Sequence, residues 1–105
     1  MEAPREHQRL ASVAVVEHIM QRVASEYPGH LTNYGLRYRN PSYEFWVEQQ
    51  NEPVPVHRFT SGSIENCTHA DAGRAARACQ YIEASIRNGI ARLGYISSDS
   101  LDGVQ

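Results

Sequence analysis

The residues best suited to bind a metal or to act in catalysis gather in the stretch 65–95, which holds both cysteines of the chain. Cys67 and His69 lie two positions apart, Cys79 follows further along, and His57 precedes the stretch. Thiolate sulfur and imidazole nitrogen are ligands that zinc prefers. Structural zinc sites usually draw their ligands in close pairs, however, and Cys67-x-His69 is the only close pair here. The spacing therefore argues against zinc, and we expect neither a metal nor another cofactor.

A cysteine nucleophile is the second chemistry to consider. Cys67 precedes a predicted helix start, which lowers the pKa of a thiol, and His69 could act as its base. No motif supplies an acidic group to orient that base, and the chain has no glycine-rich phosphate loop, HExxH or paired-carboxylate motif. We therefore expect a protein without catalytic residues.

A disulfide between the two cysteines is also disfavoured by the expected geometry. If Cys79 lies three turns into a helix, the rise from Cys67 would be about 18 Å, far beyond bridging distance. Cys79 falls on the predicted apolar stripe of that helix, where a thiol packs as a small hydrophobe. Both cysteines are predicted to be free thiols.

All ten basic side chains of this 105-residue chain are arginines, and none is lysine. Together with abundant alanine, this usage favours coding DNA rich in G and C, as in some bacteria and their phages. With twelve acidic residues, the net charge is −2, which gives no overall attraction for nucleic acid or acidic membranes. Each arginine can nevertheless make bidentate contacts to carboxylates or phosphates.

The elements that must position these residues follow from hydrophobic periodicity. A first helix is predicted from Pro4 to Tyr27, where apolar residues recur at helical spacing and Pro28-Gly29 ends the pattern. Residues 33–60 switch to a period of two, with turns at 40–42 and 49–53, and predict a three-stranded antiparallel meander. Pro55 places the third strand, 54–60, at an edge or a bulge. Residues 60–63 are predicted to form a loop.

A last helix is predicted to begin near a capping box formed by Thr68 and Asp71 and to end at Gly94. The side chains of its apolar stripe are small in the first half of the helix and large in the second half. This pattern indicates that the start of the helix approaches the sheet closely. Glu83 and Arg87 are expected to form an i,i+4 ion pair.

The fold predicted by this order is a single α+β domain, α-β-β-β-α, spanning residues 1–96, with both helices on one face of the sheet. Residues 97–105 are expected to be a mobile acidic tail. The order resembles that of double-stranded-RNA-binding domains, whose second helix begins with a basic phosphate clamp. The matching stretch here runs from His69 to Arg77 and carries Asp71 where that family needs a base.

Candidate binding residues lie away from both predicted core faces. One set follows a single side of the last helix and includes Arg74, Arg77, Tyr81 and Arg92. A second set, Arg37, Arg39 and Trp46, faces away from the core on the sheet. Cross-strand pairing with Glu44 and Glu48 could account for the arginines, whereas a lone Trp among charges is typical of an interface hot spot. Trp46 is either exposed or covered by one of the chain ends.

The function that these patterns favour is a small, non-enzymatic module that binds another protein, as an adaptor or an inhibitor. A phage-encoded inhibitor of a host complex, of the anti-CRISPR kind, is one concrete form. The alternative is a nucleic-acid-binding domain with double-stranded-RNA-binding topology. No apolar run has the length of a membrane span and no signal peptide is visible, so we expect a cytoplasmic protein. We also expect a homodimer, formed through the exposed sheet face around Trp46.

Overall fold

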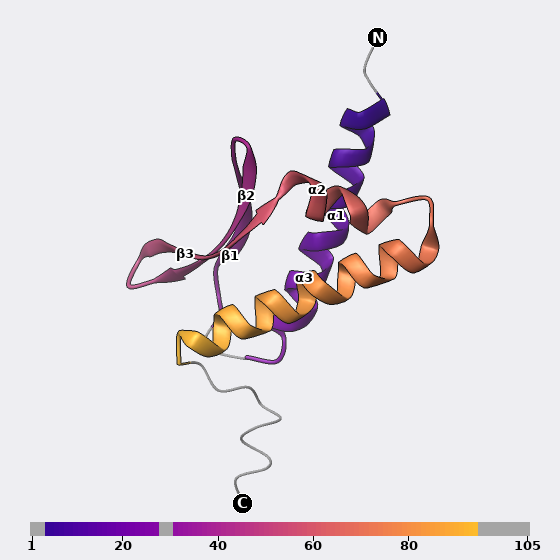
Figure 1. The fold of residues 1–105 in the computed structure, drawn as a ribbon. Coiled ribbons are helices and arrows are strands. Elements are labelled where there is room, and N and C mark those ends of the chain that lie inside the picture. The colour runs from indigo at the N-terminus through magenta and orange to yellow at the C-terminus, as the bar shows by residue number, and fades with distance from the viewer. Residues whose placement is uncertain (1–3, 28–30, 95–105) are drawn as a thin grey trace, which may run out of the picture.

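Two long helices lie on one face of a three-stranded antiparallel sheet in the computed structural model of this chain, which describes residues 4–27 and 31–94. The elements follow the order α1-β1-β2-β3-α2-η1-α3, where η1 is a short 3₁₀ helix (Figure 1). This confirms the predicted single-domain α+β fold. The predicted tail at 97–105 lies outside the described residues.

Helix α1 spans Pro4–Ala24, three residues shorter than the prediction. Its apolar side carries Val16, Met20 and Val23 at helical spacing, and all three side chains are buried. Tyr27 is also buried, but it lies in the turn after the helix, where its N–H donates to the Ala24 carbonyl. The apolar periodicity continues past the helix end because this turn still packs on the core.

The sheet consists of β1 (Tyr34–Arg39), β2 (Ser42–Gln49) and β3 (Glu52–Thr60), in that spatial order. Gln50 and Asn51 form the β2–β3 turn with positive φ angles of 53° and 67°, as two-residue hairpin turns require. This turn is shorter than predicted, so β3 begins before residue 54. A cis Asn40–Pro41 bond lies in the β1–β2 turn. β3 is an edge strand with an irregularity in its pairing to Phe45 and Trp46, which confirms the expectation drawn from Pro55.

Strand alternation decides which side chains enter the core. Tyr43, Phe45 and Val47 of β2 are almost fully buried toward the helices, together with Phe59 of β3. Their neighbours Glu44 and Trp46 point to the opposite face, as predicted. Burying each of these large apolar side chains contributes roughly 1.5–3 kcal/mol.

The predicted loop at 60–63 is wrong, because a short helix begins there. α2 spans Ser61–Glu65, and the Thr60 hydroxyl caps it by accepting from the Ser63 N–H. η1 follows at Asn66–Thr68. Ile64 and Cys67 are buried against α1. The small residues at 61–63 indicated a loop, whereas Thr60 serves as an N-cap, the position that Ser and Thr favour.

Helix α3 spans Ala72–Arg92 and is capped by Asp71, whose carboxylate accepts from the Arg74 N–H at 3.0 Å. The predicted capping box is therefore wrong: Thr68 belongs to η1, and its hydroxyl pairs with that of Ser12 at 2.6 Å. Ile82, Ile86 and Ile90 form the fully buried part of the stripe.

The expected close approach of α3 to the sheet occurs at its end rather than its start. Ala72 is exposed, and the first turns of α3 pack on η1. Gly89 is buried, and a Cβ at that position would lie 2.3 Å from Cγ1 of Val56 in β3. In Figure 1, α3 crosses α1, while β1, β2 and β3 lie together to one side of the two helices.

Candidate functional site

A hollow of about 240 Å³ lies on the helix side of the molecule, beside the N-terminal half of α3. We call it the α3 hollow; its lining residues are Ser63, Asn66, Arg74, Arg77, Ala78 and Tyr81. Three elements build it, because α2 and η1 turn the chain back so that α3 starts beside them. The predicted binding residues Arg74, Arg77 and Tyr81 are thus brought together.

Helical spacing places Arg74, Arg77 and Tyr81 on one side of α3, next to its buried stripe. Tyr81 is 53% exposed, and its ring meets the buried Phe59 ring edge-on, with centroids 6.3 Å apart. One side of the tyrosine is therefore fixed by the core while the rest faces solvent. This is a rigid aromatic anchor of the kind found at binding hot spots.

The two arginines of the hollow have no ion pair or side-chain hydrogen bond to any other residue that the structure describes. Both are exposed. The nearest acid in sequence, Asp71, uses its carboxylate to cap the helix. The hollow therefore presents two guanidinium groups whose donors are available to a ligand.

Arg92, the fourth residue predicted on this side, does not belong to the hollow. It lies in the last turn of α3, beyond Gly89, and its charge lies near His57 of β3. Burial lowers the pKa of His57, and the Arg92 charge lowers it further. Because α3 rises about 1.5 Å per residue, some 22 Å separate Arg92 from Arg77.

The sheet residues of the prediction form a separate surface, which we call the outer sheet face; it comprises Arg37, Arg39, Glu44, Trp46, Glu48 and Arg58. Arg37 and Arg58 flank Glu44 directly across the strands. Arg37 Nη2 donates to Glu44 Oε1 at 2.5 Å. The expected cross-strand pairing is thus present, and Arg58 is an additional member that alternation along β3 could have revealed.

Glu44 is the best-covered charge on this face, with only 7% of its side chain exposed. The hydrogen bond from Arg37 holds the pKa of this carboxyl below its ordinary value, and the charges of Arg37, Arg39 and Arg58 act in the same direction. Burial opposes the shift, but the arginines dominate. The Arg37 Nε–H is buried without a partner among the described residues. Arg37 therefore binds Glu44 through Nη2 and not through a bidentate contact.

Trp46 is half-buried because its indole lies over Gly35 of β1. A Cβ at residue 35 would approach the ring to 2.9 Å. The indole is therefore partly covered by its own sheet, and only part of it is available to a partner.

The cysteines lie closer together than the sequence suggested. The Cys79 thiol lies close enough to Cys67 to raise its pKa, so the expected separation of about 18 Å is wrong. The chain reverses at 69–71, and α3 then packs over η1. Both thiols are free. Burial raises the pKa of Cys67 to about 12, and the neighbouring Cys79 adds to this effect.

No group of three or more metal-ligating side chains occurs in the described parts of the chain. The predicted candidates are used otherwise: Cys67 packs in the core, and the His69 ring accepts from the Asp71 N–H at 3.0 Å. Cys67 is also a poor nucleophile, because a thiol of such high pKa is almost wholly protonated at neutral pH.

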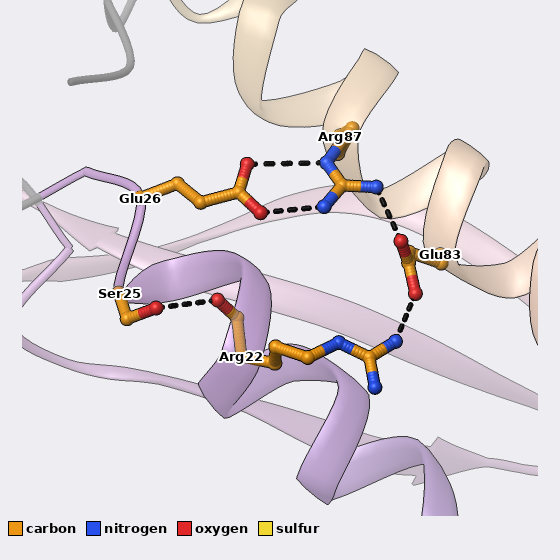
Figure 2. Close-up of polar contacts among 5 residues, drawn as sticks. All are labelled: Arg22, Ser25, Glu26, Glu83 and Arg87. Carbon is orange, nitrogen blue, oxygen red and sulfur yellow. Dashed lines mark hydrogen bonds and ion pairs between the residues drawn. The ribbon is translucent and has the colours of Figure 1, made fainter. Parts of the chain in front are cut away.

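A charged network joins the two long helices at the surface (Figure 2). Arg87 forms a fork on Glu26, with Nη2–Oε2 and Nε–Oε1 distances of 2.5 and 3.2 Å. It also pairs with Glu83, as predicted, and Glu83 in turn pairs with Arg22 of α1. These hydrogen bonds raise the pKa of Arg87 and lower that of Glu83. The network links the helix that carries the hollow to α1 and to the turn after it.

A second depression, of about 390 Å³, lies between α1 and α3 and was not foreseen. It is mostly apolar and is lined by Ala14, Val15, His18, Ile19, Arg22 and Cys79. α3 leaves this part of α1 open, and the residue that α3 contributes to the lining, Cys79, is small.

Comparison with known proteins identifies no relative: no family model, no curated protein and no solved structure matches this chain. Among the described helices, none has both the length and the apolar character needed to cross a membrane. The site must therefore be interpreted from its own chemistry.

Proposed function

We propose that this protein is a non-enzymatic binding module, an adaptor or inhibitor, that recognises an acidic surface of another protein through the α3 hollow. The observation that carries this proposal is the pair Arg74 and Arg77, which form no ion pair with another described residue, beside Tyr81, whose ring contacts Phe59. Arginine and tyrosine are enriched among the residues that dominate binding energy. Carboxylates match the arginine fork in charge and geometry.

The rest of the molecule supports binding rather than catalysis at this surface. The residues of the hollow include two guanidiniums, a phenol, a hydroxyl and an amide. This set holds no imidazole or carboxylate, the groups that most often transfer protons in catalysis. A phage-encoded inhibitor of a host complex is one form that such a module could take.

Nucleic acid is the second candidate, favoured by one observation. Arg74 and Arg77 occupy the first two turns of the last helix, where the resemblance to double-stranded-RNA-binding domains places the phosphate clamp. Asp71 weakens this candidate, since its carboxylate already occupies the helix N-terminus that would attract a phosphate. A net charge of −2 adds a further penalty.

The test is affinity capture from cells of the natural host, followed by direct binding measurements with the purified captured protein. Arg74→Gln with Arg77→Gln should weaken binding at least about tenfold, because each truncated hot-spot residue costs about 2 kcal/mol or more. Gln80→Glu with Ala91→Glu is the matched control. It also lowers the net charge by two, but its exposed α3 positions do not line the hollow.

The proposal fails if the control weakens binding as much as the arginine variant does. It also fails if nuclease treatment abolishes capture, because the partner recognised by the hollow would then be nucleic acid.

A further inference from the structure

The outer sheet face carries a charge pattern that internal pairing leaves unbalanced. Arg37, Glu44 and Arg58 form a cross-strand row, and Arg39 lies two residues beyond Arg37 on the same face. Three guanidiniums thus surround one carboxylate, which leaves two positive charges in excess around Glu44 and, once Glu48 is counted, one in excess on the whole face.

The three arginines are not equally engaged. Arg37 is committed to Glu44 through its 2.5 Å hydrogen bond. Arg39 Nε and Arg58 Nη2 each lie 3.9 Å from a Glu44 oxygen, beyond hydrogen-bonding distance, and their side chains are 57% and 68% exposed. Glu44 therefore holds these two guanidiniums over the sheet without using their donors.

A hollow of about 250 Å³ adjoins Arg58 and Glu44, and its other lining residues are Pro55, Val56 and His57. Burial disfavours the charged form of His57, so this imidazole is mainly neutral at physiological pH. Arg58 is then the cation of this hollow, and its charge can pair with an acidic group that enters there.

We propose that the outer sheet face is a second docking surface, which binds an acidic protein segment through Arg39 and Arg58. These arginines lie on the two outer strands, β1 and β3. With neighbouring strands about 4.8 Å apart, the strands that carry them are about 10 Å apart. Arg39 pairs with Ser42 and Arg58 with Glu44, so the two arginines are also offset by two residues, about 7 Å, along the strands, and their backbones are about 12 Å apart. Acidic residues four positions apart in an extended segment point to the same side and have nearly this spacing, because each residue advances about 3.3 Å.

An acidic protein segment fits this face better than a nucleic acid does. Glu44 and Glu48 lie on the same face, and Glu48 is held there by the Asn33 amide at 3.1 Å. These carboxylates would repel a continuous row of phosphates. Trp46 leans over Gly35 and is half-buried, so it is poorly placed as a platform for base stacking.

This surface is independent of the α3 hollow. The hollow belongs to the helix layer, whereas the outer sheet face is the side of the sheet that the helices leave uncovered. A protein with two arginine surfaces on opposite sides can bridge two acidic partners, which is the action of an adaptor.

The test is a nuclear magnetic resonance titration of the full chain with the synthetic peptide Glu-Ser-Ser-Ser-Glu, while the arginine Nε–H and backbone amide resonances are followed. The matching peptide with Gln in place of Glu is the control. We expect the acidic peptide to shift the resonances of Arg39 and Arg58. Arg39→Gln with Arg58→Gln removes these two Nε–H groups, so its effect is read from the backbone amides of β1 and β3, whose shifts it should abolish. Arg74→Gln with Arg77→Gln, of equal charge change, should leave these shifts intact.

Three outcomes would overturn the second surface: no shift on the sheet, a shift that survives the Arg39/Arg58 variant, or tighter binding of a single-stranded oligonucleotide of equal charge to the same face. A negative result on the outer sheet face does not contradict the function proposed for the α3 hollow. Failure of the hollow would appear separately, as unchanged partner binding in the Arg74/Arg77 variant.

Discussion

At the scale of single residues, the structure shows that a charge can be well covered without entering the core. Glu44 points away from the helices, yet arginine side chains shield it from solvent. Its lowered pKa means that the folded state favours the carboxylate more than the unfolded chain does. This contribution to stability is fully present above the ordinary glutamate pKa and is lost as the pH falls through the lower folded value.

Replacing Glu44 with Gln should therefore have an effect that depends on pH. At pH 7 we expect a loss of about 1–3 kcal/mol in the free energy of unfolding, because three arginines lose their shared partner. The difference from the wild-type protein should shrink at acidic pH, where Glu44 is protonated. Urea unfolding at pH 7 and pH 3 measures both values, and an equal loss at the two pH values would contradict this account.

The cysteines lead to a second prediction at this scale. With a pKa of about 12, the Cys67 thiol should react slowly with a thiol reagent at pH 8, while Cys79, which lines the groove between α1 and α3, reacts first. Cys79→Ser should remove the fast phase.

Because the folded pKa of Cys67 is raised, its contribution to stability is present below about pH 9 and is lost as the pH rises toward 12. Cys67→Ala should flatten that alkaline loss; an unchanged loss would rule out this assignment.

At the scale of elements, the close contact between α3 and the sheet depends on one glycine. Gly89 permits Val56 to pack against the helix, because a Cβ would overlap Val56 Cγ1 at 2.3 Å. The β-branched valine has little rotameric freedom to move away. This contact sets the distance between the two layers near the end of α3.

Gly89→Ala should consequently destabilise the protein by about 1–2 kcal/mol, since overpacking outweighs the gain of about 1 kcal/mol in helix propensity. Val56→Ala in the same chain should restore most of the loss. Gly62→Ala in α2 is the control: nothing lies near its added Cβ, so it should be neutral or slightly stabilising. Denaturant midpoints compare the variants, and a stabilising Gly89→Ala would show that the layers are not in tight contact.

At the scale of the whole molecule, local patterns predicted the two layers, but not how distant segments meet. The period-two alternation at 43–47 and the helical spacing at 82–90 were sufficient for the sheet and α3, because each pattern is repeated several times. α2 was missed since it is a five-residue helix in which Thr60 acts as a cap. The predicted distance between Cys67 and Cys79 was wrong, because a chain reversal at 69–71 leaves no periodic pattern in the sequence.

The candidate site shows the same division. Arg74, Arg77 and Tyr81 could be assigned to one side of a helix from spacing alone. Ser63 and Asn66, which complete the hollow, come from the short helices before α3, and only the tertiary arrangement brings them there. Arg92 was grouped with this set from spacing alone, yet it does not line the hollow, because residues on one side of a long helix can lie far apart along its axis.

The measurement that tests the central claim most directly is site-specific photo-crosslinking in cells, with a photoreactive phenylalanine at position 81 or, as a control, at position 91. The aromatic probe keeps the size and position of the Tyr81 ring in the hollow, whereas position 91 is an exposed site on the same helix. We predict a discrete crosslinked protein from position 81 that resists nuclease, and none from position 91. Equal crosslinking from both positions, or products from position 81 that nuclease removes, would contradict the assignment of the α3 hollow as a protein-binding surface.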